Sequence, residues 1–134
     1  MLSHIEKTNY KFGQFENASK RLDEALSLKF PTPETKADSV IQRFEFTTEL
    51  FWKFLKSLLE FKGIQVSATP VDVIRSAKSA GILQVDDEWI ALVRNRNITS
   101  HTYDDAQAMS IYIKIKDIYA PMFRKFIESH EKSA

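Results

Sequence analysis

The segment from Arg94 to Asp105, "RNRNITSHTYDD", brings together side chains that can act chemically on a phosphate group. It holds two arginines, two asparagines, a histidine and a tyrosine, directly after an apolar stretch with helical spacing. Histidine titrates near neutrality and can either give or take a proton. The planar guanidinium of arginine matches the oxygens of a phosphate. This segment is therefore the candidate site, with Arg96 and His101 as its central pair.

Each of these residues also has a purely structural interpretation. Cations are attracted to the carbonyl groups at a helix C-terminus, which would account for Arg94, Arg96 and His101. A single histidine at a helix end is more often structural than catalytic. No second histidine lies at the spacing of a metal site, so no metal and no other cofactor are expected. Three further polar side chains share the segment and favour a functional interpretation: Asn97, Ser100 and Tyr103.

Five helical segments are expected to position this site. Helical spacing and helix start and stop signals place them at about 3–28, 37–62, 70–80, from 86 or 87 to between 99 and 102, and 105–127, and in the first of them apolar positions recur at intervals of three, four or seven. Pro31 and Pro33 separate the first two segments, and Gly63 and Gly81 end the second and third. Only 3 glycines and 4 prolines occur, which also favours long helices. The sequence therefore predicts an all-α fold, an antiparallel bundle of four to five helices in a single domain spanning residues 1–134.

Local signals mark where these helices begin. Thr69 followed by Pro70 is typical of a helix start, and Asp86 or Asp87 is the expected cap of the next helix. The last helix begins after Asp104 with a capping box, and Pro121 inside it is expected to cause a modest kink. The expected buried residues are Ile5, Phe12, Phe15, Ser19, Leu22 and Leu26, then Val40, Phe44, Phe51, Leu55 and Leu58, then Trp89, Ile90, Leu92 and Val93, and finally Met109, Tyr112, Tyr119, Phe123 and Phe126.

A polar stripe along the second segment offers a competing site. Glu45 and Glu49 could be paired carboxylates for acid–base work. We favour a solvated helix face, because the same stripe places opposite charges four residues apart. The expected ion pairs are Glu49–Lys53 and Lys56–Glu60.

Composition limits the possible functions further. The chain has 19 basic and 18 acidic residues, so its net charge of +1 provides no overall attraction to nucleic acid or membrane. It contains no cysteine, which excludes disulfides, thiol nucleophiles and cysteine-bound metals. No stretch is long and apolar enough to cross a bilayer, and the first residues lack the charged and apolar regions of a signal peptide. A cytoplasmic protein is expected, and any nucleic-acid binding must come from a local cluster.

The residues of the candidate site resemble those of a known family. Residues 96–103, "RNITSHTY", fit an R-x4-H-x-Y signature. "IQRFEFTTELFWKFLKSLLEFKG" and "GILQVDDEWIALVRNRNITSHTYDDAQA" are similar to the second helix and the motif region of HEPN proteins encoded beside a minimal nucleotidyltransferase, also called nucleotidyltransferase substrate-binding proteins. The resemblance covers almost the whole chain. It departs from the family at Val71, where an arginine is expected after the proline.

This resemblance implies a toxin–antitoxin pair. The HEPN protein would be a metal-independent endoribonuclease acting on RNA, with Arg96 and His101 as catalytic residues. The supporting residues would be Asn97, Arg94 and Ser100. The minimal nucleotidyltransferase would be its partner protein and, in some systems, would silence it by adding AMP to the motif tyrosine, Tyr103.

The chemistry gives a reason for the homodimer that is typical of HEPN domains. Metal-free RNA cleavage needs a base for the 2′-hydroxyl, an acid for the leaving oxygen and cations for the developing charge. The chain has only one internal histidine, since His4 and His130 are expected at opposite and mobile ends. A two-fold dimer would place two copies of Arg96 and His101 in one composite cleft.

Two other functions remain open. The chain could be a catalytically silent subunit of the nucleotidyltransferase complex that binds a nucleotide or substrate through Arg94, Arg96 and His101. It could also be a helical interaction scaffold, which its 12% aromatic content permits.

Overall fold

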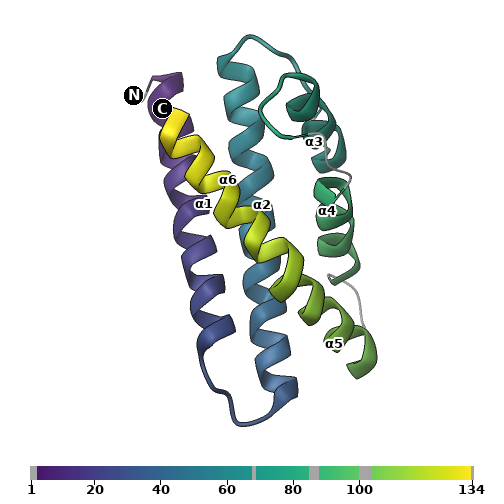
Figure 1. Ribbon diagram of the computed structural model, residues 1–134. Coiled ribbons are helices and arrows are strands. Elements are labelled where there is room, and N and C mark those ends of the chain that lie inside the picture. Colours follow the sequence, from purple (N-terminus) through teal and green to yellow (C-terminus); the bar gives the residue numbers. More distant parts are fainter. Residues whose placement is uncertain (1–2, 68, 85–87, 100–103, 134) are drawn as a thin grey trace.

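The computed structural model describes residues 3–67, 69–84, 88–99 and 104–133. In this part of the chain all regular elements are helical, and they form the predicted bundle (Figure 1). The first two helices, α1 (His4–Ser27) and α2 (Pro33–Phe61), form a long antiparallel hairpin. Two short helices, α3 (Pro70–Ser79) and α4 (Glu88–Thr99), pack beside α2. The chain then returns across α2 in one continuous rod made of α5 (Asp105–Lys114), η1 (Ile115–Tyr119) and α6 (Ala120–Ser133).

Local sequence sets most of the helix boundaries. The side chain of Ser3 accepts a hydrogen bond from the backbone N–H of Glu6 at the start of α1. Gly63 and Gly81 have positive φ angles of 81° and 77° just after α2 and α3, a conformation that glycine adopts without strain. The capping box between Asp104 and Gln107 is confirmed, with the Gln107 N–H donating to the Asp104 carboxylate at 2.8 Å.

The predicted start of α2 was four residues too late. The helix begins at Pro33, because Thr32 caps it and forms a capping box with Thr35. A proline fits the first turn of a helix, where its missing N–H would have no partner. Pro33 therefore starts the second helix, although it cannot extend the first. The predicted cap of α4, Asp86 or Asp87, lies outside the described residues.

The proline inside the last rod is accommodated by a local change of helix type. Over η1 the helix widens to a π turn, and the N–H of Ala120 bonds to the carbonyl of Ile115, five residues back. In an α-helix the ring of Pro121 would press on the carbonyl four residues before it. A wider turn directly ahead of the proline relieves that contact.

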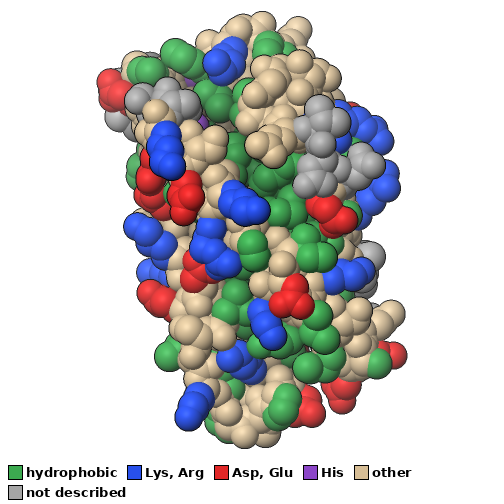
Figure 2. Space-filling view, in the orientation of Figure 1, with side chains coloured by type: hydrophobic (Ala, Val, Ile, Leu, Met, Phe, Trp, Pro, Cys, Tyr) green, Lys and Arg blue, Asp and Glu red, His purple; other side chains and the backbone are tan. Residues whose placement is uncertain are grey.

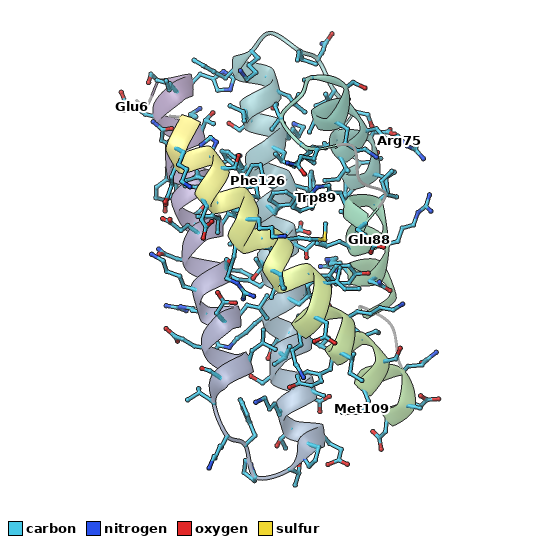
Figure 3. The ribbon with its side chains drawn as sticks, viewed as in Figure 1. Glu6, Arg75, Glu88, Trp89, Met109 and Phe126 are labelled. Carbon is cyan, nitrogen blue, oxygen red and sulfur yellow. The ribbon has the colours of Figure 1, made fainter. Side chains whose placement is uncertain are left out.

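Aromatic side chains fill the centre of the bundle. Phe51 of α2 stacks on Trp89 of α4, with ring centroids 5.0 Å apart, and also packs against Phe15 of α1 and Phe126 of α6. Figure 3 shows Trp89 and Phe126 close together in the middle of the molecule. Most of the predicted core is buried, but Ile5 is exposed, because it lies in the first turn of α1. Phe12, Leu26, Leu58, Ile90, Met109 and Tyr112 are only partly buried.

The surface matches the balanced composition. On the face shown in Figure 2, basic and acidic side chains are interspersed, and neither sign forms a large continuous area. None of the helices described has the length and apolar character needed to span a membrane.

Candidate functional site

Arg96 lies in the last turn of α4, and its side chain crosses to α2. Its Nη1 is 3.7 Å from a carboxylate oxygen of Glu45, and its Nε is 3.7 Å from one of Glu49. These distances are those of ion pairs rather than short hydrogen bonds. Because the two contacts use different nitrogens, the carboxylates of one helix fix the plane of the guanidinium. The Arg96 side chain is 26% exposed, so it is partly buried where it crosses to α2.

The two glutamates of α2 have a role that the sequence did not indicate. The Glu49–Lys53 and Lys56–Glu60 ion pairs are confirmed, at 3.4 Å each. Glu49 also accepts a hydrogen bond from the indole N–H of Trp52 at 3.1 Å. The second role of Glu45 and Glu49, holding Arg96, could not be read from α2 alone, since Arg96 is distant in sequence. The stripe is therefore partly buried against α4 at Glu45 and Glu49, whereas Lys53 and Glu60 are exposed as expected for a solvated face.

A second contact fixes α4 from its other side. The amide of Asn95 donates a hydrogen bond to the hydroxyl of Tyr119 in η1. Burial raises the pKa of the Tyr119 hydroxyl, the hydrogen bond from Asn95 lowers it, and the nearby Glu88 carboxylate raises it. The hydroxyl therefore stays protonated at neutral pH and accepts through a lone pair. No role was expected for Asn95, although it lies directly between Arg94 and Arg96.

The other predicted site residues are placed only in part. Arg94 is exposed on α4. Asn97 belongs to the last turn of the same helix, and its side chain lies outside the described part of the structure. Ser100, His101 and Tyr103 fall within residues 100–103, which also lie outside it. In the chain this segment lies between α4, which ends at Thr99, and α5, which begins at Asp105, and both of these helices are described.

The remaining two histidines both contact neighbouring helices, which differs from the mobile ends expected for them, although His4 is exposed and only His130 is partly buried. His4 contacts the backbone carbonyl of Ser57 at 3.2 Å. His130 lies against Phe12, at 4.4 Å between ring centroids, and stacks on Phe126. Both contacts involve the end of the bundle where the chain termini lie close together (Figure 1). Burial lowers the pKa of His130, and the Glu131 carboxylate partly opposes this.

The described side chains do not form a metal site. No group of three or more His, Asp or Glu residues among them is close enough together to hold an ion.

The fold is that of a small all-α helical bundle, and comparison with known sequences and structures identifies the family. Residues 10–132 match the profile of the family described as "nucleotidyltransferase substrate binding protein like". The chain therefore belongs to this family, which is part of the HEPN group.

A curated relative and a solved structure agree with this assignment. The chain is 36% identical over 88 residues to "Probable ribonuclease HepT" of Haemophilus influenzae, and this match covers 63% of the chain and 60% of the relative's length. A crystal structure from Thermus thermophilus is 35% identical, with a TM-score of 0.72, and the match covers 86% of this chain and 97% of that one. These relatives support a HEPN-domain protein with a helical-bundle fold.

Proposed function

We propose that this protein is a metal-independent endoribonuclease of the HEPN toxin type, with Arg96 and His101 as its catalytic residues. The observation that carries the proposal is the position of Arg96. Two carboxylates hold its guanidinium at the end of α4, directly before the segment that contains His101. RNA cleavage without a metal needs proton-transferring groups and a cation for the developing charge, and a preorganised guanidinium beside the histidine-containing segment supplies part of this set. The relative named as a ribonuclease supports the same activity.

The proposed site is shared between two protomers. His101 would give or take a proton, and Arg96 would stabilise the negative charge that develops on the phosphate. A second proton-transferring group is needed, and His4 and His130 are engaged in other contacts. A two-fold homodimer that brings both copies of Arg96 and His101 into one cleft would supply it. Arg94, Asn97 and Ser100 would line this cleft.

Substitutions at Arg96 and His101 test the activity. In buffer containing a chelator, the wild-type protein should cleave single-stranded RNA. Arg96→Ala and His101→Ala should reduce the rate at least about a hundredfold, the scale of one general acid–base group or one charge-stabilising group. Arg96→Lys should also be impaired, because an ammonium cannot make a bidentate phosphate contact.

Stability must be measured alongside the rates, because Arg96 also holds two helices together. Arg96→Ala leaves Glu45 and Glu49 facing each other one turn apart, where like charges repel. The expected cost is only about 0.2–1 kcal/mol, typical of partly exposed ion pairs, so the variant should remain folded. Cleavage by folded His101→Ala at the wild-type rate would refute the assignment.

The family's description favours a second candidate, a silent subunit that binds a nucleotide or substrate for a nucleotidyltransferase. This function would use the same arginines without cleaving RNA. Titration of the isolated protein with ATP separates the two: nucleotide binding without RNA cleavage supports the subunit, and cleavage without nucleotide binding supports the nuclease. In the toxin interpretation, a minimal nucleotidyltransferase is the partner protein and Tyr103 is its acceptor.

A further inference from the structure

A pocket between α1 and α2 lies outside the motif region. Its volume is about 280 Å³. Two arginines and one phenylalanine provide its distinctive chemistry. Its lining residues are Ala18 and Arg21 from α1, and Ser39, Gln42, Arg43 and Phe46 from α2.

Both arginines of this pocket lack an ion-pair partner within the described part of the chain. Arg96, Arg124 and Arg75 are each paired with a carboxylate, whereas Arg21 and Arg43 contact none. No acidic residue is among the lining residues. Two exposed guanidiniums on one small concave surface form a local cationic site, even though the whole chain is nearly neutral.

Phe46 adds an exposed aromatic face to this cationic site. Its side chain is 61% exposed, although it lies in the middle of α2, where other phenylalanines are fully buried. An aromatic ring beside arginines matches a nucleotide, because the base can stack on the ring while the phosphate contacts the guanidiniums.

The pocket and the contacts of Arg96 lie on neighbouring turns of α2. Glu45 and Glu49 contact Arg96, and the pocket residues Gln42 and Phe46 lie three residues before Glu45 and Glu49, respectively, on α2. Along the helix axis, Arg43 and Glu49 are separated by about 9 Å. A strand bound near Arg96 could therefore continue into the pocket.

We propose that this pocket binds one nucleotide of single-stranded RNA next to the cleavage position, with the base stacked on Phe46 and the phosphate held by Arg21 and Arg43. This proposal rests on the proposed ribonuclease function, and it adds a second contact region for the substrate. The pocket contributes to affinity and not to the chemical step. Its loss should raise KM and leave kcat nearly unchanged.

Binding can be measured without cleavage by using a fluorescein-labelled single-stranded 2′-O-methyl RNA, which has no free 2′-hydroxyl to attack. Phe46→Ala should weaken binding at least about fivefold, the lower range for one stacked base. Phe46→Tyr keeps a stacking ring and should bind like the wild type. Phe61→Ala is the matched control, since Phe61 is also exposed and lies at the far end of α2.

The arginines are tested by the salt dependence of binding. Arg21→Gln and Arg43→Gln should each reduce the slope of log affinity against log salt by about 0.7, the value for one phosphate contact on a single strand. Arg75→Gln removes the same charge from an exposed, ion-paired arginine of α3 and should leave the slope unchanged.

Three outcomes would overturn the pocket assignment. In the first, Phe46→Ala binds as tightly as wild type. In the second, Phe61→Ala weakens binding equally. In the third, Phe46→Ala becomes monomeric where wild type is dimeric, which would make this face a contact between two copies of the chain. The proposed function fails separately, if wild-type protein binds this RNA through Phe46 but does not cleave unmodified RNA.

Discussion

At the level of single residues, Glu45 and Glu49 set what the Arg96 guanidinium can do. Their carboxylates lie one helical turn apart and would repel each other, and the cation between them offsets this repulsion. The same contacts hold the guanidinium in one orientation before any substrate binds. Orientation before binding is what lets a charged group stabilise a transition state efficiently.

Tyr103 is the residue through which we expect the activity to be regulated. AMP attached to its hydroxyl would add bulk and a negative phosphodiester next to the motif, occupy the cationic site and repel RNA. Tyr103→Phe removes the acceptor oxygen, keeps the ring, and should escape silencing. Mass spectrometry after incubation with the nucleotidyltransferase and ATP should find AMP on wild type only. Equal modification of both proteins would show that another residue is the acceptor.

His130 should make the stability of the fold depend on pH. Burial among aromatic rings lowers its pKa, so the folded protein favours the neutral imidazole while the unfolded chain titrates near 6.5. The stability that the folded protein gains from keeping His130 neutral is fully present above about pH 6.5. It is lost as the pH falls from there toward the lower pKa of the folded state.

His130→Phe keeps an aromatic ring and removes the titration. Its melting temperature should therefore fall less between pH 7 and pH 5 than that of the wild type, a comparison that differential scanning calorimetry can make. The same pH dependence in both proteins would assign the effect to other groups.

At the level of elements, α4 is held between α2 and η1. Arg96 faces the two glutamates of α2, and Asn95 faces Tyr119 of η1. Neighbouring residues in a helix point about 100° apart, so these two contacts fix the rotation of α4 as well as its position. The motif segment therefore starts from a defined helix end.

A double-mutant cycle tests the second of these contacts. Asn95→Ala and Tyr119→Phe should each destabilise the protein, and the double variant should lose less than the sum of the two. The expected coupling is about 0.5–1.5 kcal/mol, the net contribution of one hydrogen bond. Urea unfolding of the four proteins measures it. Additive losses would mean that the contact contributes nothing to stability.

The helices, and the position of Arg96 near the end of one of them, were predictable because the sequence signals for helices are local. Apolar spacing, the capping box at Asp104 and the glycines after α2 and α3 all lie within a few residues of what they determine. The start of α2 was misplaced because Pro33 was treated only as a helix breaker. The contacts Glu45–Arg96 and Asn95–Tyr119 join residues far apart in the chain, so no local pattern indicates them.

At the level of the whole molecule, the proposed reaction depends on a second copy of the chain. One protomer carries one motif histidine, and the reaction needs two proton transfers. If a dimer forms one composite cleft, both copies of His101 act on the same phosphate. If each protomer carries an independent site, the two copies act separately. These arrangements predict different activities for a dimer with one substituted chain.

The measurement that tests the composite cleft most directly is RNA cleavage by a mixed dimer in chelator-containing buffer. Wild-type and His101→Ala chains are co-expressed with different affinity tags, and the mixed dimer is isolated by two successive purifications. We predict that it cleaves RNA at a rate close to that of the doubly substituted dimer. A rate near half that of the wild-type dimer would contradict the composite cleft, and no cleavage by the wild-type dimer would contradict the proposed function itself.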